Sequence, residues 1–201
     1  MKVNSMVNLS VQTALQATQL VQVQAIPGAL ILELAYGTPQ NFTGQVIYTH
    51  PHCFIHQVAF EKLMRAVELA RAADLQIKLF DAFRPQEAQE KLWAICPDPR
   101  YVADPAKGSL HSRGIAVDLT LADAQGIELD MGTPFDDFTD QSHQGCTTIS
   151  VGAQRNRFLL KGLMQSAGFT PIQYEWWHFN GEDPSKFPLL KDQDAPLPMM
   201  G

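Results

Sequence analysis

Apolar spacing, together with helix start and stop signals, predicts three helices along the chain. Leu63, Met64, Val67 and Ala70 recur at helical intervals, so they form one apolar stripe on a predicted helix. A second helix begins after Pro85, a residue suited to a helix start, and a third ends before a glycine. The predicted helices span residues 58–73, 86–95 and 154–167.

Short apolar or alternating runs predict strands between these helices. The expected strands are 30–35, 76–80 and 115–121, and Gly126 suggests a hairpin after the last of them. Residues 175–179 form a further short, aromatic-rich segment. Because helices and strands do not alternate regularly, the pattern favours an α+β fold over a doubly wound parallel sheet.

The ends of the chain differ from its middle. Residues 1–28 are rich in Gln, Val and Thr and end at the turn signal Pro27-Gly28, so we predict an N-terminal extension over 1–28. Residues 29–201 are predicted to form a single domain. Residues 183–201 contain four prolines and are expected to lie on the surface as a tail.

Composition and charge narrow the classes of partner. The 201 residues include 15 Lys and Arg against 21 Asp and Glu, a net charge of −6 without any basic run, which argues against nucleic acid. No apolar stretch approaches the roughly 20 residues that a membrane span needs. Polar residues such as Asn8 and Gln12 break up any leader-like segment, so the expected location is the cytoplasm. The oligomeric state is left open.

Two local clusters carry the candidate chemistry. The first runs from Ser109 to Asp118 and contains His111; the second contains Glu175 and His178. A catalytic zinc site takes three nitrogen or oxygen ligands and leaves a position for water, and His111, Asp118 and His178 offer two nitrogens and one oxygen. Glu175 would then be free to accept a proton from the activated water.

These spacings set conditions on the fold. His111 and Asp118 are seven residues apart and would face opposite sides of one straight strand, so the chain must bend between them, which Gly114 permits. Glu175 and His178, three apart, also need a turn to share one side. Spacing alone leaves open the alternative that each residue is an ordinary surface, turn or hydrogen-bonding residue.

The ordered motifs resemble those of a known enzyme family. Ser109-x-His111-x-x-Gly114-x-Ala116-x-Asp118 followed by Glu175-x-x-His178 resembles the two-part signature of the zinc D,D-peptidases, and within them the VanX-type D-alanyl-D-alanine dipeptidases (peptidase family M15, subfamily D). The resemblance runs from about residue 30 to 190. Further matching segments are Asp81-Ala82-Phe83-Arg84-Pro85, Val117-Asp118-Leu119-Thr120-Leu121, Met131-Gly132, Phe135-Asp136 and Glu175-Trp176-Trp177-His178-Phe179.

The resemblance implies a role for each matching residue. The implied zinc ligands, one ion per chain, are His111, Asp118 and His178; the implied catalytic base is Glu175; and the implied stabiliser of the oxyanion is Arg84. Asp136 matches the position that faces the substrate ammonium, and Ser109 matches a position near the substrate's other polar groups, which we take to be the carboxylate. A local turn-shaping bond for Ser109 and a plain loop acid for Asp136 stay open as alternatives.

The resemblance also implies a fold and an activity. The fold is α+β, hedgehog/D,D-peptidase-like, with a central, largely antiparallel sheet and helices packed on its outer face. The activity is zinc-dependent hydrolysis of the dipeptide D-Ala-D-Ala, serving either vancomycin resistance or recycling of D-alanine from cell-wall peptidoglycan. The alternatives are a zinc D,D-carboxypeptidase or L,D-endopeptidase acting on peptidoglycan peptides, and a non-catalytic zinc-binding module.

Overall fold

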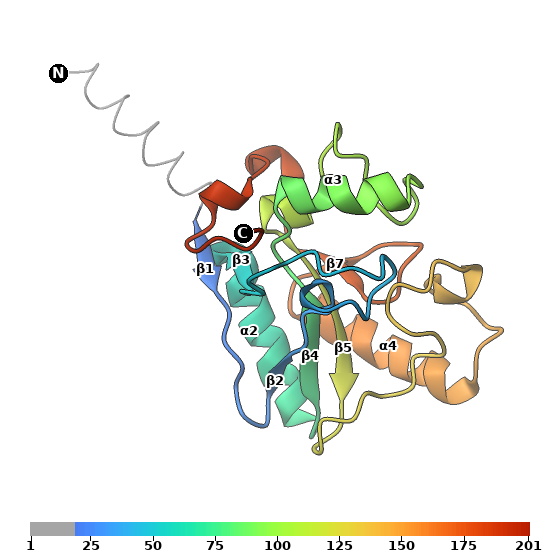
Figure 1. The fold of residues 1–201 in the computed structure, drawn as a ribbon. Coiled ribbons are helices and arrows are strands. Elements are labelled where there is room, and N and C mark those ends of the chain that lie inside the picture. The colour runs from blue at the N-terminus through green and yellow to red at the C-terminus, as the bar shows by residue number, and fades with distance from the viewer. Residues whose placement is uncertain (1–18) are drawn as a thin grey trace.

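The computed structural model describes residues 19–201, which fold around a five-stranded sheet (Figure 1). The strands lie in the order β2-β4-β5-β7-β6; β2 and β4 are parallel, and the other three neighbouring pairs are antiparallel. The predicted α+β class with a largely antiparallel sheet is confirmed. The strands are β2 (Leu30–Leu32), β4 (Gln76–Asp81), β5 (Ala116–Ala122), β6 (Thr170–Pro171) and β7 (His178–Asn180).

Two long helices cover one face of this sheet (Figure 1). They are α2 (Gln57–Ala72) and α4 (Val151–Ser166), and their apolar residues Leu63 and Leu160 share one buried cluster with Val117 and Leu119 of β5. Side chains alternate between the two faces of a strand, so Asp118, which lies between Val117 and Leu119, projects from the opposite face. The helices therefore bury one face and leave the other for polar chemistry.

A second apolar cluster surrounds the remaining helix. Helix α3 (Gln86–Ile95) buries Ala88 and Leu92 against Tyr48 and Phe54 rather than against the face of the sheet that α2 and α4 cover. Phe54 belongs to β3 (Phe54–His56), which pairs with β1 (Leu20–Gln22) in a separate antiparallel ribbon. These two strands were not among the predicted elements, because three residues are too few to show an alternating pattern.

The helices match the predicted ranges closely, with one early start. The structure gives α2 and α3 within a residue of the prediction, whereas α4 begins at Val151 instead of residue 154. The hydroxyl of Ser150 explains the difference, since its Oγ accepts a hydrogen bond from the amide of Ala153 at 3.0 Å and so caps the first turn. The three cysteines carry free thiols.

The predicted surface tail is wrong in part. Leu190 and Met199 are buried in the second cluster, and the amide of Leu190 donates to the carbonyl of Ser112 at 2.7 Å. The carbonyl of Leu190 in turn accepts from the amide of Gln86 at 3.0 Å, one of the amides at the start of α3 that the helix itself cannot satisfy. The C-terminal segment thus supplies backbone partners to the elements around it.

The predicted extension over 1–28 overlaps the described residues only from Gln19 onward. Val23 is buried in the main cluster, and its amide donates to the carbonyl of Cys53 at 2.8 Å. Residues 1–18 lie outside the described part of the chain. The division of the chain at residue 28 stays a prediction.

Gly114 provides the bend that the sequence requires between His111 and β5. It follows the short 3₁₀ helix His111–Arg113 and has a φ of +68°, a left-handed conformation that strains any other residue. A Cβ at this position would lie 2.7 Å from Leu20 Cδ2 and 3.1 Å from the backbone nitrogen of His56. The predicted role of Gly114 as the bending residue is confirmed.

We expect Gly114→Ala to lower the free energy of unfolding more than the matched change Gly44→Ala. Gly44 has a similar φ of +66° but open space around its Cα, so it carries only the conformational strain of about 1–2 kcal/mol. Gly114→Ala adds the clash with Leu20 and the His56 backbone, which costs a further ~1–3 kcal/mol. Urea denaturation of both variants measures the difference; equal losses would contradict the close packing at Gly114.

Candidate functional site

Three neighbouring strands place polar residues in one row across the sheet. Asp81 at the end of β4 is the register partner of Asp118 in β5, and Asp118 is the register partner of His178 in β7. Directly opposed residues on adjacent strands project to the same face, so these side chains meet. The face is the one that α2 and α4 do not cover, because Val117 and Leu119 pack toward the helices.

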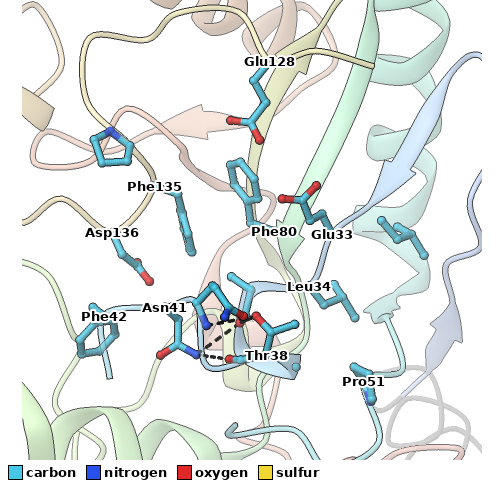
Figure 2. A pocket seen from close by; sticks show the side chains of 15 residues that line it. Glu33, Leu34, Thr38, Asn41, Phe42, Pro51, Phe80, Glu128, Phe135 and Asp136 are labelled. Atoms are coloured by element: carbon cyan, nitrogen blue, oxygen red, sulfur yellow. Dashed lines mark hydrogen bonds between the residues drawn. The ribbon is translucent and has the colours of Figure 1, made fainter. Parts of the chain in front are cut away.

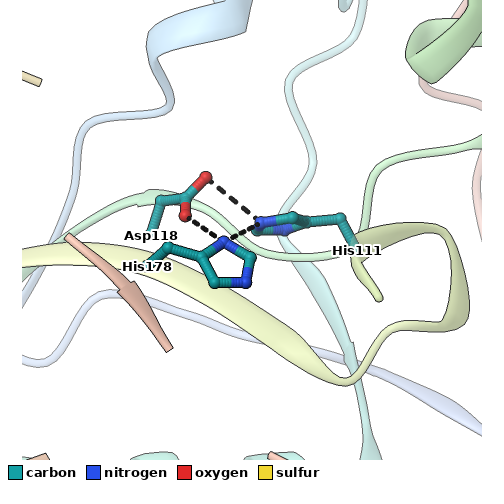
Figure 3. Close-up of side chains that lie close together, drawn as sticks. All are labelled: His111, Asp118 and His178. Atoms are coloured by element: carbon teal, nitrogen blue, oxygen red, sulfur yellow. Dashed lines mark hydrogen bonds and ion pairs between the residues drawn. The ribbon is translucent and has the colours of Figure 1, made fainter. Parts of the chain in front are cut away.

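His111 completes the cluster from outside the sheet (Figure 3). Its Nε2 lies 3.1 Å from His178 Nδ1 and 3.2 Å from Asp118 Oδ2, and His178 Nδ1 lies 3.0 Å from Asp118 Oδ1. His111 sits in the 3₁₀ helix before Gly114, so the bend turns its ring back onto the strand residues. The structure therefore brings the three predicted metal ligands together.

Hydrogen bonds of the ring nitrogens that face away from the cluster fix the tautomers of both imidazoles. His111 Nδ1 lies 2.7 Å from the carbonyl oxygen of Ala82, and His178 Nε2 lies 2.7 Å from Asn180 Oδ1. A nitrogen facing a carbonyl or amide oxygen carries the proton, so the other nitrogen of each neutral ring presents its lone pair to the cluster. Two lone pairs and a carboxylate thus converge on one point.

This donor set fits a divalent metal ion. A tetrahedral zinc ion with bonds of about 2.0–2.1 Å holds its ligand atoms about 3.3 Å apart, close to the spacings of 3.0–3.2 Å within the cluster. The guanidinium of Arg84, whose Nη2 lies 3.4 Å from Asp118 Oδ2, favours the ionised form of this carboxylate. An ionised carboxylate beside two neutral imidazoles is a common ligand set for zinc.

Glu175 lies at the edge of this cluster without belonging to it. The chain bends at residues 176–177 before β7, and Glu175 Oε2 comes within 3.8 Å of His178 Nδ1. The side chain is buried, and burial, together with repulsion from Asp118 and Asp136, raises the pKa of Glu175 well above its usual value. The structure thus meets the condition that a turn bring Glu175 and His178 to one side.

Arg84 is held rigidly on the other side of the cluster. Its Nε donates to Asp81 Oδ2 at 2.8 Å and its Nη1 to Gln89 Oε1 at 3.0 Å, which leaves Nη2 3.4 Å from Asp118 Oδ2. Burial opposes the charge of the guanidinium, but Asp81 outweighs it and the pKa of Arg84 rises, so the group remains a cation. A buried, positioned cation beside a metal site can stabilise negative charge that develops there.

The two predicted substrate-binding residues lie in the same small cavity as the cluster. Asp136 accepts hydrogen bonds from Tyr36 Oη, and both burial and the charge of Asp118 raise the pKa of Asp136. Ser109 Oγ accepts from the backbone amide of His111 at 3.1 Å, which is the turn-shaping bond named as its alternative role. The cavity encloses about 190 Å³ and is also lined by Arg84 and Glu175.

Several supporting residues were missed by the sequence reasoning. Gln89 anchors Arg84 and donates to the carbonyl of Ala103, and Tyr36 reaches Asp136 from 100 residues away, a contact with no local signal. Asn180 could have been found, because it lies two residues after His178 in a strand and therefore on the same face.

We expect Asn180→Ala to weaken zinc binding by about 10–100-fold, the usual effect of removing the partner of a ligating histidine. The change removes the acceptor that holds the proton on His178 Nε2. Competition for Zn²⁺ with a chromophoric chelator measures the affinity. Asn180→Asp keeps an acceptor and should retain tight binding, and Asn156→Ala, an asparagine that bonds the carbonyl of Asp130, serves as the control. Unchanged affinity in Asn180→Ala would contradict the tautomer assignment.

Comparisons with known proteins identify relatives of this chain. The chain is 44% identical over 176 residues to a D-alanyl-D-alanine dipeptidase of Escherichia coli (strain K12), covering 88% of this chain and 91% of that protein. It is 32% identical to a D-alanyl-D-alanine dipeptidase of Enterococcus faecium, covering 80% of this chain and 86% of the relative. Among solved structures, it is similar to VanYB in complex with D-Alanine-D-Alanine, with a TM-score of 0.43 and 17% identity over 66% of this chain and 74% of the other.

A family model gives the same assignment over most of the sequence. The model of the peptidase M15 family, described as D-ala-D-ala dipeptidase, matches residues 16–194. The match therefore extends across every element that contributes to the metal cluster, from β4 to β7. The chain belongs to the peptidase M15 family of D-Ala-D-Ala dipeptidases.

Proposed function

We propose that this chain is a zinc-dependent dipeptidase that hydrolyses D-Ala-D-Ala to two molecules of D-alanine. The observation that carries the proposal is the convergence of two imidazole lone pairs and one ionised carboxylate within 4.8 Å of one another, beside a separate buried carboxylate. Family membership supplies the substrate, since the relatives are named for this dipeptide. The geometry supplies the reaction type, metal-assisted hydrolysis.

His111, Asp118 and His178 would hold one zinc ion per chain. When bound, zinc lowers the pKa of a coordinated water to about 7 and polarises a carbonyl oxygen. Three protein ligands would leave room for a water molecule, as catalytic rather than structural zinc sites do. The outer partners of His111 and His178 keep both lone pairs directed into the cluster.

Glu175 acts as the general base and then as the acid. Its Oε2 lies 3.8 Å from His178 Nδ1, at the edge of the ligand cluster, where it would take a proton from the attacking water. The water oxygen bonds to the peptide carbonyl carbon, the carbon–nitrogen bond breaks, and Glu175 returns the proton to the leaving amine. The products are one D-alanine with a new carboxylate and one with a new ammonium.

Arg84 stabilises the negative charge that develops on the carbonyl oxygen. Asp81 and Gln89 fix the guanidinium before substrate arrives, so little reorganisation is needed during the reaction. Removing one such positioned donor typically costs about 3–4 kcal/mol of transition-state stabilisation.

Asp136 and Ser109 would hold the two ends of the dipeptide. Asp136 faces the cavity with a carboxylate suited to the ammonium, and Ser109 offers a hydroxyl for the carboxylate end. The cavity volume of about 190 Å³ falls below the roughly 300–1,000 Å³ of sites for drug-sized ligands, and so suits a substrate as small as a dipeptide.

The same observations weigh against the alternatives. A carboxypeptidase or endopeptidase acting on peptidoglycan needs room for a longer peptide, which the small cavity does not offer. A non-catalytic zinc module has no use for a buried base and a fixed arginine, yet Glu175 and Arg84 both line the cavity. Within residues 19–201, no helix is long and apolar enough to cross a membrane. A cytoplasmic location stays part of the proposal.

The deciding experiment is an amine-release assay on D-Ala-D-Ala, L-Ala-L-Ala and a muramyl-pentapeptide analogue, with and without a chelator. We expect release from the D,D-dipeptide alone, loss of activity with the chelator, and recovery with Zn²⁺. Turnover of the pentapeptide at a rate similar to that of the dipeptide would favour a carboxypeptidase instead. Activity that survives complete removal of metal would reject the proposed chemistry.

We expect Glu175→Ala and Glu175→Gln to lower kcat by at least about 100-fold, because general acid–base catalysis typically contributes 10²–10⁴-fold. Zinc content should stay near that of the wild type, since Glu175 is not among the three ligands. The control is Glu68→Gln, an exposed glutamate on α2, which should leave both properties unchanged. An active Glu175→Ala protein that binds zinc would refute the assignment of the base.

A further inference from the structure

A second and larger cavity shares Asp136 with the small one, and Figure 2 shows its lining. Its volume is about 730 Å³, and Leu32 of β2 and Phe80 of β4 form part of its lining. Phe80 stacks on Phe135 with ring centroids 4.7 Å apart, which gives the cavity an aromatic wall. Its volume lies within the roughly 300–1,000 Å³ that ligand pockets commonly enclose. None of the roles proposed so far uses this space.

Asp136 belongs to the lining of both cavities. In Figure 2 it stands at one end of the larger cavity, beside Phe135 and Phe42. Its backbone has a φ of +60°, an uncommon conformation for a residue with a side chain, although aspartate tolerates it better than most. Such a conformation persists only where the surrounding structure enforces it, and here it accompanies a carboxylate at the boundary between the two cavities.

Tyr36 fixes the carboxylate at that boundary. Its hydroxyl lies 3.1 Å from Asp136 Oδ2 and 3.3 Å from Oδ1. The ring is buried and makes edge contacts with Phe42, Tyr48 and Phe135, so it has little freedom to move. The neighbours of Tyr36 in the chain, Ala35 and Gly37, line the larger cavity, whereas Tyr36 itself lines the smaller one.

We propose that the larger cavity is a latent subsite for a group attached to the amino end of the substrate, and that Asp136 and Tyr36 form the partition that closes it off. The inference rests on the proposed function, in which the substrate ammonium faces Asp136. An acyl group on that nitrogen would occupy the place of the Asp136 carboxylate, and the larger cavity lies directly beyond it. The pair therefore determines specificity for a free dipeptide.

The partition excludes N-blocked substrates for two physical reasons. An amide nitrogen carries no charge, so it leaves the Asp136 carboxylate without the cation that offsets the burial of that group. The acyl group also collides with the Asp136–Tyr36 pair, which the packed ring of Tyr36 keeps from moving aside. Removing the side chain at residue 136 relieves both effects, whereas neutralising it relieves only the first.

The lining of the larger cavity indicates which acyl groups it takes. Phe80 and Phe135 favour an apolar group, and Glu33 and Glu128 disfavour an acidic one. Lys78 forms ion pairs with both glutamates, at 2.9 and 3.0 Å, so the three side chains together carry one negative charge. The subsite therefore suits acetyl and uncharged or cationic aminoacyl groups.

The test compares two variants of the same residue on two substrates. Both Asp136→Asn and Asp136→Gly remove the charge and tolerate the positive φ, but only glycine removes the volume. The measured quantity is the ratio of kcat/KM for N-acetyl-D-Ala-D-Ala to that for D-Ala-D-Ala. Hydrolysis of the blocked substrate needs only water: the peptide bond breaks to give N-acetyl-D-alanine and D-alanine.

We expect both variants to lose activity on the free dipeptide, and Asp136→Gly to raise the ratio at least about tenfold above Asp136→Asn. Tyr36→Phe keeps the packed ring and removes the hydrogen bond to Asp136. It should raise the ratio above that of the wild type, by a smaller factor than Asp136→Gly does. If the ratio for Asp136→Gly does not exceed that for Asp136→Asn, the partition is refuted. A wild-type protein that binds zinc but does not hydrolyse D-Ala-D-Ala would refute the proposed function itself. Failure of the partition differs, because the wild type then still hydrolyses the free dipeptide.

A further variant checks that the acyl group enters the larger cavity. Gln40 is exposed on the rim of that cavity and takes no part in the proposed chemistry, so Gln40→Trp should leave hydrolysis of D-Ala-D-Ala unchanged. Combined with Asp136→Gly, it should reverse most of the gain on N-acetyl-D-Ala-D-Ala by filling the space. A gain that persists in full in the double variant would place the acyl group elsewhere and overturn the inference.

Discussion

The buried carboxylate of Asp118 is the point around which the proposed site is organised. It lies between two imidazoles and a guanidinium, and its strand position makes it the register partner of both Asp81 and His178. Two imidazole lone pairs 3.1 Å apart repel each other unless a cation lies between them. The hydrogen bonds of His111 Nδ1 and His178 Nε2, on the sides of the rings that face away from the cluster, hold this unfavourable arrangement in place. A binding site for a divalent cation requires such fixed lone pairs.

The two faces of the sheet have different roles: apolar packing on one face stabilises the fold, and the other face carries the charged site. On one face, Val117 and Leu119 pack with α2 and α4, and this burial of apolar surface stabilises the fold. On the other face, the row formed by Asp81, Asp118 and His178 collects charges whose removal from water is costly. A single strand, β5, carries both functions because its side chains alternate between the faces.

Much of the fold and of the candidate site could be predicted from the sequence. The features that were missed share a cause: they depend on contacts between distant segments. Helical periodicity located α2, and Pro85 marked the start of α3. Spacing alone left the metal cluster open, and the resemblance of the ordered motifs to the zinc D,D-peptidases singled out its three ligands. Tyr36 and Gln89 were missed because they act through contacts between distant segments. The C-terminal segment was misjudged for a related reason: its prolines mark local breaks in structure, but they do not reveal that Leu190 exchanges backbone bonds with Ser112 and Gln86.

Tyr36 contributes both to the rigidity of the site and to its proposed substrate specificity. Tyr36 packs its ring 5.0 Å from the guanidinium of Arg84 while its hydroxyl bonds Asp136, so one buried side chain supports both the group proposed to stabilise the oxyanion and the group proposed to bind the ammonium. Loosening Tyr36 to admit a larger substrate would also disturb Arg84. A change confined to Asp136 avoids that coupling, because Asp81 and Gln89 still hold the guanidinium. Substrate range is therefore easier to alter at Asp136 than at the tyrosine that positions it.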